Sequence, residues 1–179
     1  YTLLDKGSHA SLGFTHARRA LFMGGGTLYM YYARGGDSLN IGAAGEGNAV
    51  LIKSAYPWQD TQSGPEALAL MQALNLDAAG LPRSVEKLCA GQTLLCRALA
   101  LKVSEWNAGR FDPTQFYLDD VGTVLPQIIQ TTRLGISADR DAHLPWRFVD
   151  PAYARYCTLN PLRRGQISSE HYCYVDNAG

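Results

Sequence analysis

The chain has 179 residues, of which 46% are hydrophobic and 18% charged, and its formal net charge is zero. This composition indicates a folded globular chain that buries one sizeable core, and it excludes a disordered chain. A neutral balance gives no sign of a nucleic-acid partner, which a strongly basic balance would give. No apolar run is long enough to cross a bilayer, and the first residues lack a signal-peptide pattern, so we expect no membrane partner.

The first regular elements predicted along the chain are three strands. Residues 27–33 alternate and are rich in tyrosine, which favours a strand. A turn at 35–37 leads into a second strand at 38–43. A second turn, at 45–48, leads into a third strand at 49–55. Because both turns are short, we expect the three strands to form an antiparallel meander.

Helices are predicted next. Residues 66–76 carry apolar side chains at helical spacing, and Pro65 suits the first turn of that helix. Ser84 is a good cap for a helix that starts at Val85. Gly91 is expected to break this second helical segment, which then resumes over residues 93–103.

The last part of the chain returns to short strand-like runs. These lie between residues 116 and 136, at 116–118, 127–129 and 132–136. The order of strands, helices and strands predicts an α+β fold in a single domain, with a curved antiparallel sheet surrounded by helices. Residues 151–179 show little periodicity, and we expect them to form a loosely packed tail of that domain, which spans 1–179.

The four cysteines predict no metal site. Cys89 and Cys96 are separated by about two helical turns on an apolar helix face, which predicts buried free thiols. The spacing of Cys157, His171 and Cys173 is not that of a standard zinc site. Few, scattered thiols fit a reducing intracellular compartment.

Two aromatic residues are candidates for holding a flat ligand. His9 lies in a polar loop, where a histidine is either simply exposed or capping, or is a flat group that packs against a base. Tyr31 shares one strand face with Tyr29, whereas Tyr32 faces the other way. Strand tyrosines are commonly core residues. Alternatively, a flipped nucleotide would stack on Tyr31 with His9 opposite.

Two polar residues in apolar strands are candidates for reading that ligand. Asn40 lies between Leu39 and Ile41, so its amide either bonds to the backbone or points into a pocket and tests an edge of a base. Lys53 ends the apolar run 50–52. It is either solvated or, in a ligand pocket, binds a phosphate or holds a water.

Several motifs, taken in chain order, resemble the alkyladenine (3-methyladenine) DNA glycosylase family. They are Gly7-Ser8-His9-Ala10, Gly26-Thr27-Leu28-Tyr29-Met30-Tyr31-Tyr32, Ser38-Leu39-Asn40-Ile41, Ala49-Val50-Leu51-Ile52-Lys53, Leu88-Cys89-Ala90-Gly91, Leu95-Cys96-Arg97-Ala98-Leu99, Thr132-Arg133-Leu134-Gly135-Ile136 and Pro145-Trp146-Arg147-Phe148. The resemblance covers about residues 1–150. It implies a fold like a formyltransferase C-terminal domain.

The resemblance also implies an activity. The family flips an alkylated or deaminated purine out of double-stranded DNA and hydrolyses its N-glycosidic bond with a water, in base excision repair. It uses no metal and no other cofactor. We therefore expect a monofunctional hydrolase that acts as a monomer on lesion-containing duplex DNA. Its compartment would be intracellular, in the cytoplasm or nucleoid of a bacterium or the nucleus of a eukaryote.

Site residues follow from the same resemblance. The base would be bound by Tyr1, His9, Tyr31, Asn40 and Leu51, and Asn40 would exclude normal guanine by crowding its 2-amino group. Lys53 stands where the family has arginine, beside the catalytic water, and the Leu134 carbonyl would also hold that water. Arg19 would contact a phosphate.

The chain departs from the family pattern in three places. The family's catalytic Glu stands shortly before the pocket tyrosine, so we expect it upstream of Tyr1, in a part of the protein that this sequence lacks. The loop after Tyr32 is shortened, so the wedge that fills the gap left by a flipped base is expected to be Arg34 or, after a register shift, Tyr32. The family's Gly-Pro-x-Lys is replaced at residues 91–94, which removes its Pro and Lys.

Two other hypotheses fit these departures. The first is a binding module that recognises lesions or DNA shape with the same pocket but cleaves slowly or not at all. The second is a structural domain of the formyltransferase type with no role at lesions. A Glu two residues before the pocket tyrosine distinguishes the enzyme from the binding module.

Overall fold

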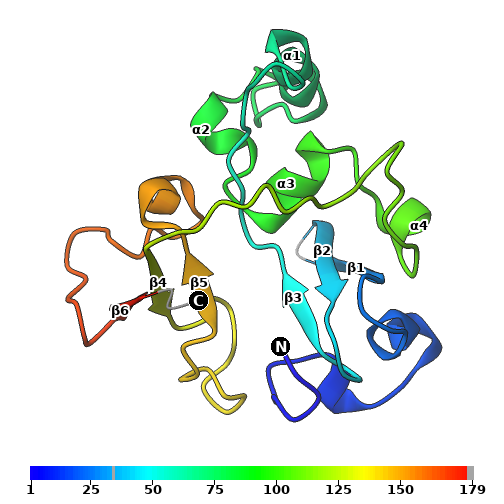
Figure 1. Cartoon of the computed structure of the whole chain (residues 1–179), viewed down its shortest axis with the longest axis vertical. Coiled ribbons are helices and arrows are strands. Elements are labelled where there is room, and N and C mark those ends of the chain that lie inside the picture. The colour runs from blue at the N-terminus through cyan, green and yellow to red at the C-terminus, as the bar shows by residue number, and fades with distance from the viewer. Residues whose placement is uncertain (34, 177–179) are drawn as a thin grey trace.

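Two three-stranded antiparallel sheets with helices and loops around them form the α+β fold (Figure 1). The computed structural model describes residues 1–33 and 35–176. The first sheet has the order β1-β2-β3 and contains β1 (Leu28–Ala33), β2 (Gly36–Gly42) and β3 (Ala49–Leu51). It confirms the predicted meander, although its third strand ends earlier than expected.

The second sheet has the order β5-β4-β6 and contains β4 (Gln127–Thr131), β5 (Arg147–Val149) and β6 (Tyr172–Asp176). The strands of the described chain are therefore divided between two sheets instead of lying in one curved sheet. Of the strand-like runs expected between residues 116 and 136, only the middle one is a strand. Phe116 makes an isolated bridge to Asp112.

The tail also differs from the expectation of loose packing. The 3-10 helix η3 (Pro151–Tyr156) follows β5, and β6 pairs with β4 along five residues of each strand. Ala154 of η3 is buried with Ile129 and Val149, so the tail forms one side of a small core. This pairing joins segments far apart in the sequence, and the short strand β6 carries no strong periodicity of its own.

Short helices cover the first sheet. Helix α1 (Pro65–Leu74) starts at the predicted proline, and Gly91 separates α2 (Val85–Leu88) from α3 (Gln92–Ala98) as predicted. Helix α3 packs against β2, and α4 (Val103–Trp106) against β1. The approach of α3 requires a glycine in the sheet, because a Cβ at Gly36 would lie 2.1 Å from Cγ2 of Thr93.

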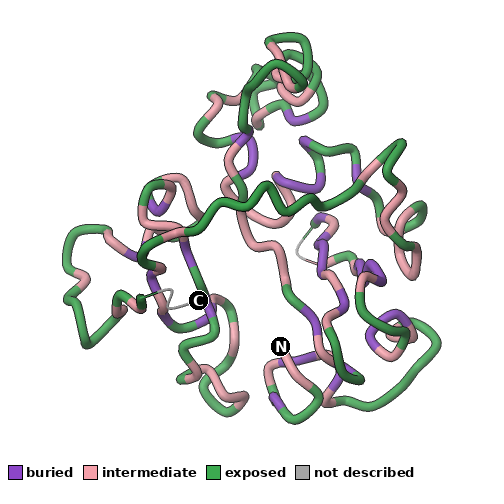
Figure 2. Tube along the Cα trace, in the orientation of Figure 1, coloured by how far each residue is buried: buried purple, intermediate pink, exposed green. Residues whose placement is uncertain are grey.

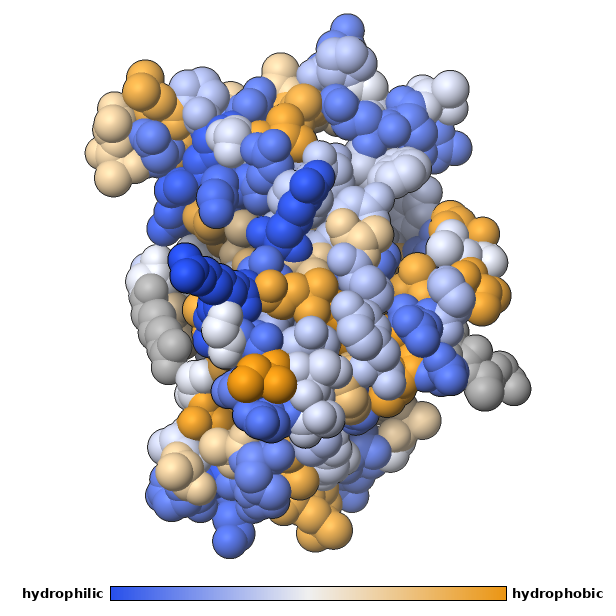
Figure 3. Space-filling view, turned by 90° about the vertical axis from the view of Figure 1, so that its left-hand side faces the viewer, coloured by the Kyte–Doolittle hydropathy of each residue, from blue (hydrophilic) through white to orange (hydrophobic). Residues whose placement is uncertain are grey.

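The 3-10 helices η1 (Ala10–Leu12) and η2 (His16–Phe22) lie in the N-terminal segment. Helix α1 has no buried residue, and Figure 2 shows buried residues in the sheets and also in the region of α2 and α3. On the side that carries the second sheet, apolar and hydrophilic side chains are interspersed (Figure 3). Among the described residues, no helix is long and apolar enough to span a membrane.

Successive side chains of β1 point to opposite faces of the sheet and pack into two different cores. Leu28 and Met30 point to the helical side, where they pack with Cys96. Tyr29 points to the other side, where it packs with Ala10 and other residues of the N-terminal segment. Successive strand residues face opposite sides of a sheet, so Tyr31 lies on the face of Tyr29, and this face carries the candidate site.

The two cysteines of the helical region are free and buried, as predicted. They do not share one helix face, because Cys89 follows the last residue of α2 whereas Cys96 lies within α3. Burial raises the pKa of the Cys89 thiol to about 11 and that of Cys96 to about 12. Both thiols are therefore protonated at neutral pH, as expected of packing residues.

Candidate active site

A small cavity of about 210 Å³ lies between the N-terminal segment, the first sheet and the loop that follows β4. It brings together all the residues that the sequence proposed for base binding and for holding the water. These are Tyr1, His9, Tyr31, Asn40, Leu51, Lys53 and Leu134. The cavity is smaller than the pockets of about 300–1000 Å³ that take drug-sized ligands, and its size suits a single base.

Strand register places three side chains in one row across the first sheet. Tyr29 is opposite Asn40, and Asn40 is in turn opposite Leu51. Directly opposed residues of antiparallel strands point to the same face. All three therefore line the cavity, with Tyr31 two residues farther along β1.

Tyr1 adds a further row at the edge of this sheet. Its nitrogen donates to the Ala49 carbonyl at 3.0 Å, and the Ala49 N–H donates to the Tyr1 carbonyl at 3.1 Å. This exchange of two hydrogen bonds is the pattern of an antiparallel pair. Tyr1 is thus held against β3, and it lines the cavity together with Leu51.

His9 and Tyr31 form one aromatic wall. Their ring centroids are 4.5 Å apart with an interplanar angle of 59°. A base between two rings needs about 7 Å, twice an ordinary carbon contact distance. The sequence suggested that His9 would lie opposite Tyr31, across a base. The structure instead has the two rings in contact at a tilt, so no base fits between them.

Tyr29 supports this wall, although the sequence did not identify it as a site residue. His9 Nδ1 and Tyr29 Oη share a hydrogen bond of 2.8 Å, and the Tyr29 side chain is almost fully buried. Burial raises the pKa of Tyr29 to about 12, so the phenol remains protonated. The position of Tyr29 on the same strand face as Tyr31 was the signal that could have revealed it.

His9 itself is a weak base in this position. Burial, followed by the positive charges of Arg140 and Arg18, lowers the pKa of the imidazole below its ordinary value of 6.5. The ring is therefore neutral at neutral pH. A neutral ring is the form suited to stack on a positively charged purine.

We expect this lowered pKa to make the protein less stable in weak acid. As the pH falls below 6.5, the unfolded chain binds a proton at His9, while the folded chain stays neutral until its lower pKa is reached. The free energy of unfolding should decrease through that window. Urea unfolding across the window should show a smaller acid loss for His9→Asn than for the unchanged chain. Equal losses in the two proteins would contradict the assignment.

Asn40 combines both alternatives that the sequence left open. Its Nδ2 donates to the Tyr29 carbonyl at 3.1 Å, and the residue also lines the cavity. The side chain is 5% exposed, so its amide cannot rotate freely to meet a ligand. The backbone bond instead holds the amide in a fixed plane beside the space that a base would occupy.

Lys53 is held by a polar chain that crosses from β3 to α3 and β2. Its Nζ donates to Gln92 Oε1 at 3.0 Å, and Gln92 Nε2 donates to Ser38 Oγ at 2.7 Å. Ser38 is fully buried, so this chain has a rigid end. Gln92 also lines the cavity, although the sequence identified it only as a departure from the family's proline.

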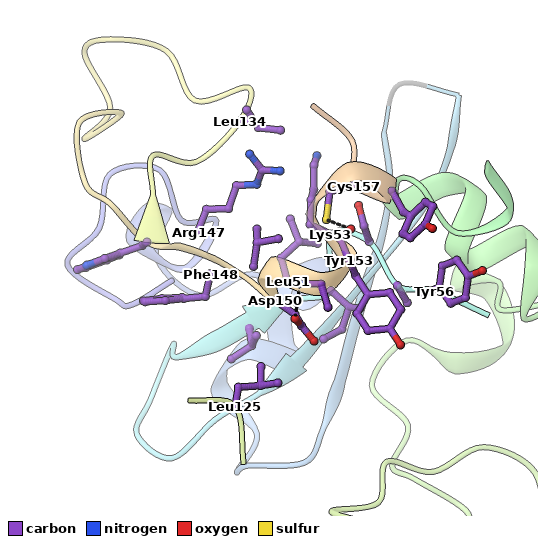
Figure 4. Close-up of a pocket in the computed structure, with 18 of the residues that line it drawn as sticks. Leu51, Lys53, Tyr56, Leu125, Leu134, Arg147, Phe148, Asp150, Tyr153 and Cys157 are labelled. Carbon is purple, nitrogen blue, oxygen red and sulfur yellow. Dashed lines mark hydrogen bonds between the residues drawn. The ribbon is translucent and has the colours of Figure 1, made fainter. Parts of the chain in front are cut away.

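A larger cleft of about 1330 Å³ lies beside the small cavity, between β3 and β5. Figure 4 shows Lys53 and Leu51 on one side of this cleft and Arg147 and Phe148 on another. The lining is mostly apolar, and it does not include His9, Tyr31 or Asn40. The cleft shares Tyr1, Leu51, Lys53 and Leu134 with the small cavity.

Two of the residues expected to contact DNA, Arg19 and Tyr32, lie outside the small cavity. Arg19 lies in η2, where its Nη1 contacts His16. Tyr32 is 69% exposed near the end of β1, on the face away from Tyr31. Arg34 lies outside the described residues. Of the described candidates for DNA contact, neither Arg19 nor Tyr32 lines the small cavity.

The fold and the cavity together define a class of protein. An α+β domain with one small cavity, lined by aromatic rings, a fixed amide and a lysine, is suited to hold a single flat heterocycle. A family profile of methylpurine-DNA glycosylases matches residues 1–154. The chain belongs to this family and is a DNA glycosylase, a hydrolase of DNA repair.

Three bacterial relatives illustrate the similarity, and each is named provisionally as a 3-methyladenine DNA glycosylase. The protein of Pseudomonas savastanoi pv. phaseolicola is 61% identical over 98% of this chain and 79% of its own length. That of Pseudomonas aeruginosa is 61% identical over 96% of this chain and 72% of its own length. That of Corynebacterium glutamicum is 29% identical over 78% of this chain and 69% of its own length.

Proposed function

We propose that this enzyme flips an alkylated or deaminated purine of the 3-methyladenine type out of duplex DNA and hydrolyses its N-glycosidic bond with a water. The observation that carries the proposal is the convergence of seven separately identified residues on one cavity of about 210 Å³. In this arrangement the base lies between Tyr1 on one side and His9 with Tyr31 on the other. Base–aromatic stacking is tolerant of sequence, and an enzyme that acts on several lesions needs that tolerance.

The reaction needs a carboxylate to activate the water. The described residues that line the cavity include no Asp or Glu. We propose that the carboxylate belongs to a Glu two residues before Tyr1. If the register between Tyr1 and Ala49 continues, that residue lies opposite Leu51. Its side chain then points to the same face as Tyr1, which is the face of the cavity.

The other groups would position the water and stabilise the sugar. Lys53 Nζ is held by Gln92, and Leu134 lines the same cavity. A water held between them is oriented before the bond breaks. An alkylated purine already carries positive charge and leaves readily. The carboxylate would activate the water and stabilise the oxocarbenium-like sugar.

The DNA partner would be held by residues outside the cavity. Arg19 is proposed to contact a phosphate, and Tyr32 or Arg34 to fill the gap left by the flipped base. Flipping costs a few kcal/mol of stacking, so a wedge is needed. We propose that the enzyme acts as a monomer on genomic DNA inside the cell. The test is release of free base from a duplex with one lesion, by a chain that carries the proposed Glu.

The second candidate is a lesion-binding module that cleaves slowly or not at all. It would use the same cavity to recognise a lesion. The two candidates predict the same binding to lesion duplexes. They differ in whether a Glu before Tyr1 produces excision.

Asn40 is expected to decide which purines are rejected. Its fixed amide would crowd the 2-amino group of guanine, so Asn40→Ala should raise excision of undamaged guanine relative to hypoxanthine by roughly tenfold. The two rates are measured on duplexes that differ at one base. Asn75→Ala is the matched control, because Asn75 is also a buried amide bonded to backbone carbonyls, those of Leu88 and Leu94. If both variants only lose stability, Asn40 does not read the base.

A further inference from the structure

A buried ion pair lies behind the cavity. Arg133 Nη1 donates to Asp5 Oδ2, and Arg133 Nη2 donates to Asp5 Oδ1 at 3.0 Å. The side chains of Arg133 and Asp5 are 4% and 0% exposed. Asp5 also accepts from the Gly7 N–H at 2.7 Å, and Arg133 Nη2 donates to the Asp141 carbonyl at 2.9 Å. The pair is therefore bidentate, desolvated and hydrogen-bonded at both ends.

The pair joins two loops that both line the cavity. Asp5 precedes Gly7 and His9 on the N-terminal loop, and Arg133 precedes Leu134 on the loop after β4. Two further bonds connect these loops. The Lys6 N–H donates to Asp141 Oδ2 at 2.9 Å, and Arg140 Nε donates to the Lys6 carbonyl at 2.7 Å.

The cation of this pair lies against the rings of Tyr1 and Trp146. The Arg133 guanidinium carbon is 5.0 Å from the centroid of the Tyr1 ring and 5.4 Å from that of Trp146. Tyr1 lines the cavity in which the base is proposed to stack. A base against Tyr1 would therefore have a buried guanidinium close behind the ring. Lys53 and Arg140 already bring positive charge to the cavity lining.

We propose that Asp5 is a specificity-determining residue, which cancels the charge of Arg133 and so lets the cavity accept a positively charged purine. The proposal rests on the function proposed above. It adds that the enzyme distinguishes cationic lesions from neutral ones. A cationic base such as 7-methylguanine is repelled by an unpaired guanidinium. A neutral base such as hypoxanthine has no net charge to be repelled. Coulomb energies are large at sites shielded from water, and salt screens them little there.

The test compares affinities for two duplexes of the same sequence, one with 7-methylguanine and one with hypoxanthine. Binding is used because it does not require the catalytic carboxylate. Asp5→Asn keeps a hydrogen-bonding side chain but leaves Arg133 unpaired. We expect it to lower the ratio of cationic to neutral affinity by about tenfold. Arg133→Gln leaves Asp5 unpaired, and we expect the ratio to rise.

The opposite signs separate this role from a purely structural one. A pair that only ties the two loops together would weaken binding of both lesions equally in both variants, and that result would overturn the proposal. The double variant Asp5→Asn with Arg133→Gln is neutral again and should restore the ratio of the unchanged chain. Thermal melting identifies a variant that does not fold. The single variant that does fold then decides. Asp5→Asn should lower the ratio of cationic to neutral affinity below that of the unchanged chain, and Arg133→Gln should raise it.

Failure of the proposed function gives a different result. In that case the unchanged chain would bind both lesion duplexes no more tightly than the undamaged duplex. If the unchanged chain prefers both lesions and the ratio does not move in either variant, only the role of Asp5 is wrong.

Discussion

A chain with Glu two residues before Tyr1 is expected to release free base from lesion duplex about 10²- to 10⁴-fold faster than the same chain with Gln at that position. The antiparallel pairing of Tyr1 with Ala49 is the physical reason, because its continuation by two residues would direct this side chain to the cavity face. Gln has the same shape but cannot take a proton from the water. The rate is measured by single-turnover release of hypoxanthine or 3-methyladenine.

The 179-residue chain itself is the control, and we expect it to excise almost nothing. Rapid, saturable excision by this chain would place the carboxylate elsewhere. Asp5 is poorly suited to replace it, because both of its oxygens are already bonded to Arg133. Equal rates for the Glu and Gln chains, with tight binding of lesions by both, would favour the lesion-binding module.

Removal of the Tyr31 ring is expected to weaken binding of lesion duplex by roughly tenfold to a hundredfold. Stacking of a base on an aromatic side chain contributes about 1–3 kcal/mol. Tyr31→Ala also removes the ring that contacts His9 at a centroid distance of 4.5 Å, so His9 loses its partner in the aromatic wall. Fluorescence anisotropy with a hypoxanthine duplex and its undamaged counterpart measures the change.

Tyr31→Phe is the matched control for this change. It keeps the ring and removes only the hydroxyl, so the preference for lesion over undamaged duplex should be nearly unchanged. A loss as large in Tyr31→Phe as in Tyr31→Ala would mean that the hydroxyl carries the contribution. An equal loss on lesion and undamaged duplexes would mean that Tyr31 does not stack on the base.

Local patterns in the sequence were sufficient for the first sheet and for the helix break. Alternation and short glycine turns place β1, β2 and β3 in an antiparallel meander, and Gly91 separates α2 from α3. These features depend on residues close to one another along the chain. The motifs that resemble the glycosylase family likewise identified seven of the residues that line the cavity, because each motif is short and continuous.

The same patterns were not sufficient for the second sheet or for the way the walls of the site are arranged. Strand β6 pairs with β4 across a long stretch of chain, and the two short strands have no local signal that specifies this partner. The placement of His9 beside Tyr31, instead of opposite it, also depends on how the N-terminal loop packs on the sheet.

The sequence by itself therefore determined which residue types meet at the site, since motif identity depends only on order and spacing. Tertiary structure decided how those residues are held. Gln92 meets Lys53 from another element, and Arg133 meets Asp5 from a loop 128 residues away. Such contacts form when distant segments pack together and buried polar groups must find partners. The hydrophobic periodicity of either segment does not indicate which residue will be the partner of its polar group.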